Sequence, residues 1–452
     1  MPALIIDNAY IATVNSRGVE HPIGHVVIEG TRIVAVGAGR APQADYPGAA
    51  VINATGKLVT PGLINTHHHL YQWLTRGFAQ DSILFDWLVA LYPAWSRIDA
   101  DLTGAGAAGA MAVLARSGCS TVADHHYIFP QGSGDIVGSI VHEAASLGVR
   151  LHATRGSMDL GRSQGGLPPD FAVETTGAAL QASADAVAAH HDPSFDSMAQ
   201  VAIAPCSPFS VTSELLREAA ILGRDLGVRL HTHGSETVEE DAFCRERFGM
   251  SPTDYLQDVG WLGDDVWMAH CVHLDPDAIA KFAATGTGVA HCPSSNGRLG
   301  AGIAPVRDML RANVAVGLGV DGAASNESGQ LGTEIRQAVL MNRLRDGADA
   351  MSARDGLYVA TMGGARVLGR QDQIGSLEVG KLADIAVWDV SGVEHAGIAD
   401  PVASLGLAGM PPLTALIVNG QMTVSDGHLT RADEHQIARR VEAASAELAA
   451  RL

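Results

Sequence analysis

The sequence predicts an α/β protein centred on a (β/α)8 TIM barrel, with a small β-sandwich-like domain formed from both chain ends. Eight short apolar runs lie between Lys57 and Leu368, and each ends on a polar or small residue before a helix-like segment. Alternating apolar and polar segments flank that region on both sides. The chain has 452 residues, 47% hydrophobic and 17% charged, which supplies a large core and argues against long disorder.

The small domain is predicted from segments with the two-residue period of β-strands. In residues 1–58, ALIIDNAYIATVN and HVVIEGTRIVAVG alternate between turn residues, as antiparallel strands do. The same pattern returns at 376–390 and 413–424, so we expect residues 369–431 to complete the small domain. The Ala-, Glu- and Arg-rich stretch 432–452 has apolar residues at helical spacing and predicts a terminal helix.

The barrel is assigned to residues 59–368. Its eight predicted strands are LVTPGLINTHHH (58–69), STVADHH (120–126), VRLHATRG (149–156), QVAIAPC (200–206), VRLHTH (228–233), VWMAH (266–270), TGVAHCP (287–293) and VAVGLGVD (314–321). Many of the 19 histidines lie at the C-terminal ends of these runs. That end of a TIM barrel is where active sites are built, so the pattern predicts an enzyme site there.

The charge balance excludes several classes of partner. Lys and Arg number 30 against 49 Asp and Glu, a formal net charge of −19, and no basic cluster interrupts it. A nucleic-acid backbone or an anionic membrane would be repelled, so we expect neither partner and instead a small, weakly charged ligand. The five scattered cysteines form no C-x-x-C pair, and no signal peptide is visible. We therefore expect a cytoplasmic protein with reduced thiols.

Side chains at four of the strand ends predict a metal site. His67 and His69 lie two residues apart on the first barrel strand, so both should face the barrel interior and His68 should point outward. Strand six ends in His270 and strand eight in Asp321, on the same rim. Catalytic zinc takes about three or four nitrogen or oxygen ligands, with one position left to water. A His-rich strand end could explain one His-x-His pair alone, but it does not explain this convergence.

Strand five offers two further candidate ligands, His231 and His233, which share one face of the strand. Spacing alone does not choose between them. We favour His233, because it lies nearer the strand end and precedes Glu236 by three residues. His231 would lie deeper, as a hydrogen-bonded core histidine.

Five segments resemble the amidohydrolase superfamily, in its mononuclear zinc branch of nucleobase deaminases and s-triazine hydrolases. They are PGLINTHHHL (61–70), HTHGSE (231–236), AHCVHL (269–274), AHCPSSN (290–296) and GVDGAASN (319–326). The flanking β segments also resemble the split small domain of that family, so the resemblance covers nearly the whole chain. It implies a homo-oligomer, a dimer or larger. It also implies the metal ligands His67, His69, His233 and Asp321 and the catalytic partners Glu236 and His270.

The lysines indicate how many metal ions to expect. The chain has only Lys57, Lys281 and Lys381, and none lies at the C-terminal end of a predicted barrel strand. Binuclear members of the superfamily use a carboxylated lysine on strand four, whereas strand four ends here at Cys206. We therefore expect one Zn²⁺ per chain, with Fe²⁺ as the alternative.

The candidate residues suggest a hydrolytic mechanism. Bound Zn²⁺ lowers the pKa of its water from 15.7 to about 7. We expect Asp321 to take the proton of that water, and His270 to orient the hydroxide and stabilise the developing charge. Glu236 would carry a proton to a ring nitrogen, so that the tetrahedral carbon expels ammonia.

Other polar residues near these positions are expected to have no catalytic role. Glu239, Glu240 and Asp241 are interpreted as solvated carboxylates at a helix start, where negative charge suits the helix dipole. Four more strand-end histidines could line the pocket or could equally be hydrogen-bonded structural residues, and we expect no catalytic role for any of them, namely His125, His126, His273 and His291.

Two residues are candidates for binding the substrate. Gln72 follows the first strand, and its carboxamide can complement the lactam edge of a hydroxylated purine or pyrimidine. Cys206 ends strand four, where backbone groups could contact the planar ring of the substrate on the side away from Gln72. Cys206 is poorly motivated as a nucleophile, because the metal already supplies one. Arg155 and the loop 161–166 could close over the site, although ordinary loop structure explains them as well.

Within this branch, three segments resemble the bacterial 8-oxoguanine deaminases, which implies the reaction of 8-oxoguanine with water to urate and ammonia. They are HHHLYQWLTR (67–76), RGSMDLGRSQGGLPPD (155–170) and HCPSSNGRLGAGIAPV (291–306). The alternatives are an isocytosine, guanine or s-triazine aminohydrolase, and a non-catalytic barrel scaffold, which we would expect to have lost its ligands. A phosphate-binding barrel has little support, because the glycines at 286–288 and 317–319 do not open helices.

Overall fold

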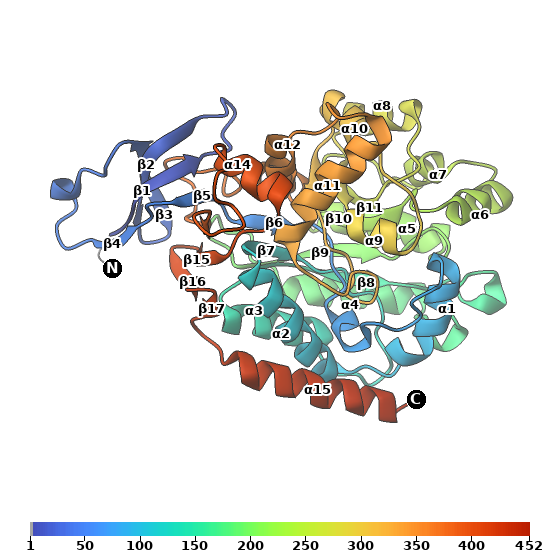
Figure 1. Ribbon diagram of the computed structural model, residues 1–452. Helices are drawn as coiled ribbons and strands as arrows, with labels where there is room; N and C mark the ends of the chain where they lie inside the picture. Colours follow the sequence, from blue (N-terminus) through green and yellow to red (C-terminus); the bar gives the residue numbers. More distant parts are fainter. Residues whose placement is uncertain (1–2) are drawn as a thin grey trace.

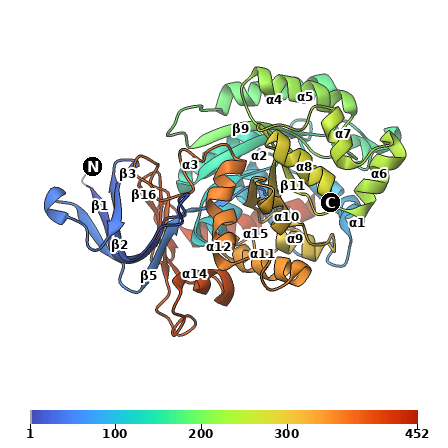
Figure 2. The same ribbon diagram turned by 90° about the horizontal axis from the view of Figure 1, so that it is seen from above.

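The computed structural model describes residues 3–452 and confirms the predicted fold class (Figures 1 and 2). A closed parallel barrel is surrounded by helices, and a mixed sheet built from both chain ends lies beside it. In chain order the barrel strands are β6 (Leu63–Asn65), β7 (Cys119–Ala123), β8 (Arg150–Ser157), β9 (Ala199–Pro205), β10 (Leu230–Gly234), β11 (Val266–His270), β12 (Gly288–His291) and β13 (Val316–Leu318). Each of the eight predicted runs overlaps one of these strands.

The first predicted run, 58–69, is not one continuous strand. Its beginning belongs to β5 (Lys57–Pro61) in the small sheet, and the barrel strand β6 has only three residues. Gly62 lies between them, where a Cβ would come within 2.6 Å of both side-chain atoms of Ser120. Only glycine permits this close approach, through which the chain passes from one sheet to the other.

Helices cover the outside of the barrel, and most of them begin at a residue suited to capping. Asp or Thr side chains at Asp99, Asp135, Thr175 and Thr212 each accept a hydrogen bond from the first helical turn. Between β6 and β12 the helices are the 3-10 helix η2 (Leu70–Thr75), α1 (Leu84–Trp95), α2 (Ala100–Arg116), α3 (Ile136–Leu147), the 3-10 helices η3 (Arg162–Gln164) and η4 (Asp170–Ala172), α4 (Thr176–His190), α5 (Ser213–Asp225), α6 (Val238–Phe248), α7 (Pro252–Asp258) and α8 (Pro276–Thr285). Beyond β12 they are α9 (Pro293–Arg298), α10 (Val306–Arg311), α11 (Leu331–Asp346), α12 (Ala353–Tyr358), the π-helical turn η5 (Val359–Gly363) and α13 (Gly364–Val367).

The two chain ends share one nine-stranded sheet. Antiparallel pairing of β14 with β5 joins them, in the order β17-β16-β15-β14-β5-β1-β2-β3, with β4 beside β1. The strands are β1 (Leu4–Ala12), β2 (Glu20–Glu29), β3 (Arg32–Ala38), β4 (Ala50–Asn53), β14 (Ile385–Asp389), β15 (Leu413–Val418), β16 (Gln421–Ser425) and β17 (His428–Leu429). Ile6, Val26, Ile385 and Ile417 belong to one buried cluster, so the ends also share a core.

The C-terminal part of the chain contains less strand than the sequence pattern suggests, and it ends in the expected helix. Of the stretch 376–390, only β14 is a strand, and α14 (Pro401–Ala403) and the π-helical turn η6 (Ser404–Ala408) precede β15. The expected terminal helix is α15 (Glu434–Ala450), which packs on α2 through Val441, Ala444 and Leu448 (Figure 1). The domain boundaries after residues 58, 368 and 431 stay predictions.

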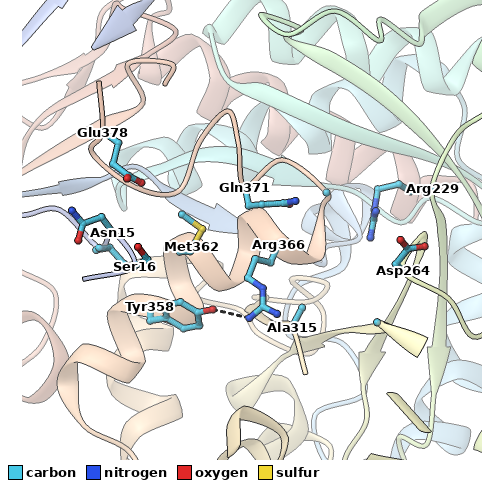
Figure 3. A pocket seen from close by; sticks show the side chains of 13 residues that line it. Asn15, Ser16, Arg229, Asp264, Ala315, Tyr358, Met362, Arg366, Gln371 and Glu378 are labelled. Atoms are coloured by element: carbon cyan, nitrogen blue, oxygen red, sulfur yellow. Dashed lines mark hydrogen bonds between the residues drawn. The ribbon is translucent and has the colours of Figure 1, made fainter. Parts of the chain in front are cut away.

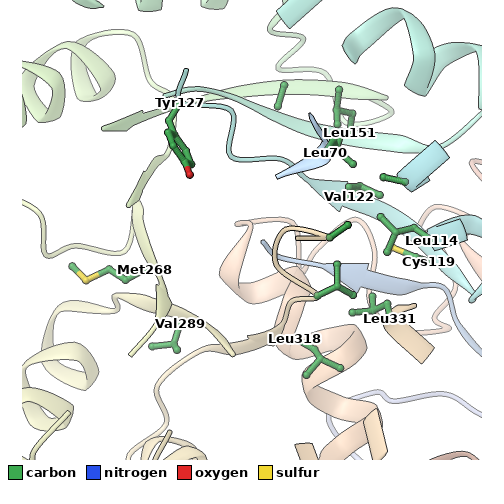
Figure 4. Close-up of a cluster of buried hydrophobic side chains, with 14 of the residues drawn as sticks. Leu70, Leu114, Cys119, Val122, Tyr127, Leu151, Met268, Val289, Leu318 and Leu331 are labelled. Carbon is green, nitrogen blue, oxygen red and sulfur yellow. The ribbon is translucent and has the colours of Figure 1, made fainter. Parts of the chain in front are cut away.

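The main core packs the barrel strands against their helices (Figure 4). Val289 and Leu318 come from the neighbouring strands β12 and β13, and Leu114 comes from α2. All three side chains are fully buried. Truncating such a side chain typically costs about 2–5 kcal/mol, so this packing holds the strand ends in place. No helix within residues 3–452 has both the length and the apolar composition needed to cross a bilayer.

A buried ion pair joins the barrel to the small sheet. Arg150 at the start of β8 donates from Nε and Nη2 to the two carboxylate oxygens of Asp384, at 3.2 and 3.0 Å. Both side chains are almost completely buried. The backbone N–H of Asn419 donates to Asp384 as well, at 2.8 Å. The geometry is bidentate, so each charge has several partners.

We predict that Asp384→Ala lowers the free energy of unfolding by about 3–5 kcal/mol, because it leaves Arg150 buried without a countercharge. Urea denaturation measures the change. Asp258→Ala is the control, because its pair with Arg217 is exposed and should contribute no more than about 1 kcal/mol. Equal losses for the two variants would contradict the structural role of the buried pair.

A cavity of about 600 Å³, whose lining side chains are drawn in Figure 3, lies at the opposite end of the barrel from the histidine-bearing strand ends. Arg229 and Ala315 line it just before β10 and β13, and Asn15 and Ser16 reach it from the β1–β2 loop. No histidine or cysteine lines it among the described residues. The N-terminal end of a TIM barrel serves stability rather than catalysis, so we do not place the chemistry here.

Candidate metal centre

His67 and His69 lie just beyond β6, in an irregular segment rather than on the strand itself. The N–H of Asp321 donates to the carbonyl of His67 at 3.1 Å, which ties this segment to the end of β13. Both histidines are buried, and the Nε2 atom of each lies 3.3 Å from Oδ1 of Asp321. The expected convergence is therefore present. His68 is also buried, and it is absent from the clusters of potential ligands.

Backbone carbonyls determine which ring nitrogen of two histidines carries a proton. Nδ1 of His69 lies 2.6 Å from the carbonyl oxygen of His125, and Nδ1 of His233 lies 2.7 Å from that of Cys206. A carbonyl only accepts, so both Nδ1 atoms are protonated. Burial lowers the pKa of both rings and keeps them neutral. Each Nε2 atom is then unprotonated and carries a free lone pair, and the two Nε2 atoms lie 3.2 Å apart.

His231 orients His67 in the same way. Nδ1 of His231 lies 2.9 Å from the carbonyl of Trp267, so its Nε2 is an acceptor for Nδ1–H of His67 at 2.8 Å. This leaves Nε2 of His67 as a third lone pair, without a hydrogen-bond partner in the described chain. Nε2 of His67 and Nε2 of His69 both face Oδ1 of Asp321, and Nε2 of His233 lies next to that of His69. Lone pairs crowded in this way against a carboxylate repel one another unless a cation binds. The chain thus has a His/Asp metal-binding site.

His125 was not expected in this cluster. One of its nitrogens lies within 4.8 Å of ligand atoms of His67, His69 and His233, and its ring stacks on His233 at 4.7 Å. Its Nε2 donates to the carbonyl of Ala204, as expected of a structural histidine. The only signal in the sequence was its place at the end of the second barrel strand.

Among the other histidines, His126 and His273 are hydrogen-bonded to backbone carbonyls, which is the structural one of the two expected alternatives. His291 is not, since neither ring nitrogen has a partner within the described residues.

Glu236 and His270 lie beside the histidine and aspartate ligand atoms. Nε2 of His270 is 3.6 Å from Oε2 of Glu236 and 3.9 Å from Oδ2 of Asp321. Burial, followed by the charges of Asp321 and Glu240, raises the pKa of Glu236 well above its ordinary value. The carboxyl group of Glu236 can therefore hold a proton near neutral pH and release it to a bound molecule.

Glu240 corrects one expectation. It is fully buried rather than solvated, and its two carboxylate oxygens accept the backbone N–H groups of Ser235 and Glu236, at 3.0 and 2.8 Å. The sequence showed only that Glu240 lies at an acidic helix start. In the structure the first turn of α6 directs its side chain toward the end of β10. Glu240 thus anchors the backbone that carries Glu236.

Three strand ends of the site have left-handed backbone at residues other than glycine. Ser235, His270 and Asp321 have φ values of 52°, 72° and 65°. Each such residue costs about 1–3 kcal/mol and persists only where the surrounding structure holds it. The strain turns the chain sharply after the strand, directly where functional side chains leave the barrel.

A small cavity of about 30 Å³ opens onto this cluster. Its lining brings together most of the predicted site residues, and His67 lies outside it. The lining residues are His69, Gln72, Leu84, Trp87, Leu88, Tyr127, Cys206, Phe209, His233, Glu236, His270, Leu299 and Asp321. The apolar wall from α1 and from Phe209 and Leu299 was not predicted, because no polar pattern marks it. Arg155 does not line the cavity and instead pairs with Glu174.

The two predicted substrate contacts both line the cavity. Gln72 is fully buried, and neither its Oε1 nor its Nε2 has a hydrogen-bond partner among residues 3–452. Gly322 permits this placement, because a Cβ there would lie 1.8 Å from Oε1 of Gln72. Burial raises the pKa of the Cys206 thiol to about 12, so the thiol stays protonated and is a poor nucleophile.

Comparisons with known proteins agree with this geometry. The model of the amidohydrolase family matches residues 58–428. An 8-oxoguanine deaminase of Pseudomonas aeruginosa is 41% identical over 445 residues, covering 97% of this chain and 98% of that protein. An isoxanthopterin deaminase from an unknown prokaryotic organism is 37% identical, covering 97% and 96%. The crystal structure of an atrazine chlorohydrolase from Arthrobacter aurescens TC1, complexed with zinc, has a TM-score of 0.93 at 32% identity, covering 98% and 100%.

Proposed function

Since the chain belongs to the amidohydrolase family, we propose that it is a metal-dependent hydrolytic deaminase that converts 8-oxoguanine and water into urate and ammonia. The observation that carries the proposal is the set of three histidine lone pairs and one carboxylate oxygen converging beside a buried acid. The choice of 8-oxoguanine is supported by the similarity to the Pseudomonas aeruginosa deaminase over nearly the whole chain.

The proposed metal ligands are His67, His69, His233 and Asp321, holding one Zn²⁺ per chain, with Fe²⁺ as the alternative. Their donor set fits such an ion, because neutral imidazole nitrogens and a carboxylate are ordinary zinc ligands. When bound, the ion supplies a water whose pKa is lowered to about 7.

The chain's own residues would move the protons of the reaction. Oδ2 of Asp321 faces His270 and can accept a proton from the attacking water. Glu236, held protonated by burial, can donate its proton to a ring nitrogen of the base, and Asp321 can then pass the proton taken from the water to the leaving amine. His270 lies between these two carboxyl groups and can stabilise the charge that develops there.

Gln72 would recognise the substrate. Its free amide offers a donor and an acceptor together, which matches the carbonyl and N–H of a lactam. Trp87 and Phe209 supply aromatic surface to the same cavity. A cavity of about 30 Å³ is too small for a bicyclic base, so some of the side chains that line it have to move when such a base enters.

We predict that Gln72→Ala lowers kcat/KM for a lactam substrate by about one to two orders of magnitude, the loss of two hydrogen bonds. Steady-state ammonia release measures it. Gln80→Ala is the matched control, because Gln80 is an exposed glutamine outside the cavity. An unchanged kcat/KM would remove Gln72 from the site.

Release of ammonia, or of an alkylamine from the s-triazine, tests the substrate over a panel of bases. The panel contains 8-oxoguanine, guanine, isocytosine, isoxanthopterin and hydroxyatrazine, and we expect the highest kcat/KM for 8-oxoguanine. A higher kcat/KM for isocytosine, guanine or the s-triazine would show that 8-oxoguanine is the wrong substrate and that the other base is the better one. No amine release from any member, by protein loaded with metal, would support the non-catalytic scaffold.

A further inference from the structure

The short helix α9, which forms the turn after β12, carries two polar side chains, Ser295 and Asn296, that contact the site without lining its cavity. Ser295 donates its hydroxyl proton to Oδ2 of Asp321 at 2.5 Å, and Ser325 lies 2.9 Å from the same hydroxyl. The other carboxylate oxygen, Oδ1, accepts the N–H of Gly322 at 2.7 Å. Both oxygens are therefore held, and Oδ1 is the one that faces His67 and His69.

The next residue, Asn296, contacts His270 instead. Its Oδ1 lies 3.0 Å from Nδ1 of His270, and the side chain is buried. With Nδ1–H donated to this amide, Nε2 of His270 points to Glu236 and Asp321. An imidazole without this partner could rotate about its χ2 torsion, which is intrinsically broad.

A buried carboxylate on α11 accepts hydrogen bonds from this turn and from the loop after β13. Glu334 of α11 accepts the N–H of Ser294 at 3.1 Å and the amide of Asn326 at 3.0 Å. Asn326 also donates to the carbonyl of Val320, next to Asp321. Glu334 thus connects the turn after β12 to the loop after β13, so the two segments keep a fixed spacing.

We propose that Ser295 and Asn296 are positioning residues, which orient Asp321 toward the histidine cluster and His270 toward Glu236. Neither residue lines the substrate cavity, so each acts through its partner. The inference rests on the metal site of the proposed function. Ser295 and Asn296 should therefore affect different properties. Loss of Ser295 should weaken metal binding, because Asp321 is a proposed ligand, and loss of Asn296 should lower kcat, because His270 is a proposed proton-transfer partner.

The first test is the affinity for Zn²⁺, measured by competition with a chromogenic chelator. We expect Ser295→Ala to weaken binding about 10- to 100-fold, as loss of a partner of a metal ligand does. Ser295→Thr keeps the hydroxyl and should retain most of the affinity. Ser183→Ala is the control, since Ser183 is a buried serine on α4 whose hydroxyl contacts only a backbone carbonyl.

The second test is the kinetics of Asn296→Ala, on whichever base the wild type deaminates fastest. We expect kcat to fall about 10- to 100-fold with KM and Zn²⁺ affinity close to wild type. The matched control is Asn342→Ala, because Asn342 is a buried asparagine bonded only to a backbone carbonyl. A general loss of stability would affect both asparagine variants alike.

These experiments separate failure of this inference from failure of the proposed function. If the wild type binds Zn²⁺ and Ser295→Ala binds it equally well, the role of Ser295 is wrong and the deaminase proposal is untouched. If Asn296→Ala keeps the wild-type kcat, or loses no more than Asn342→Ala, the role of Asn296 is wrong. A wild-type chain that binds no divalent metal would overturn the proposed function and the positioning roles together.

Discussion

Replacing Glu236 by glutamine is expected to lower kcat by about 10²- to 10⁴-fold while the metal content stays at the wild-type level. Glutamine keeps the size and polarity of the side chain but has no proton to exchange. Burial raises the pKa of Glu236, so the wild-type residue can act as an acid where an ordinary glutamate is ionised. Steady-state ammonia release gives kcat, and elemental analysis gives the metal content.

Glu239→Gln is the control for this experiment. Glu239 is in the same acidic run, but it does not line the cavity. We expect its kcat to stay near that of the wild type. A Glu236→Gln enzyme with a wild-type kcat and full metal would show that the acid is another group.

The second large effect is expected from His233→Ala, which removes one of the four proposed ligand atoms. The metal content should fall far below one ion per chain, and activity should fall with it. His231→Ala should behave differently, because His231 contacts His67 and the carbonyl of Trp267 rather than the converging lone pairs. We expect that variant to bind metal about 10- to 100-fold more weakly and to regain activity in excess Zn²⁺.

Metal analysis and activity of these two variants decide which strand-five histidine is the ligand. Spacing in the sequence left both open, because residues two apart share a face of the strand. The reverse pattern, with metal lost in His231→Ala and retained in His233→Ala, would contradict the tautomer argument.

The barrel could be predicted because each strand is a short apolar run followed by a polar or small residue. This pattern is visible in the sequence alone and needs no knowledge of contacts between distant segments. The first strand was the exception. Residues 58–69 read as one run, but β5 pairs with the small sheet and β6 with the barrel. The change occurs at Gly62, and its reason is the close approach to Ser120, a contact between segments distant in the sequence.

In the site, the sequence indicated which side chains end the strands but not how they are held. The protonation pattern of His69 and His233 depends on the carbonyls of His125 and Cys206, and no residue pattern marks a backbone carbonyl. The apolar wall from α1 is likewise set by packing, since Leu84 and Trp87 look like any other core residues of a helix. Burial of Glu240 depends in the same way on how α6 meets the strand end.

The proposed function depends most on a single metal ion held by His67, His69, His233 and Asp321. The direct test is the number of divalent ions per chain in the purified protein, measured by elemental analysis before and after chelation, together with the activity of each sample. We predict about one Zn²⁺ or Fe²⁺ per chain, loss of activity on chelation, and recovery with about one equivalent of added metal. Full activity in protein freed of metal, or a requirement for two ions per chain, would contradict it.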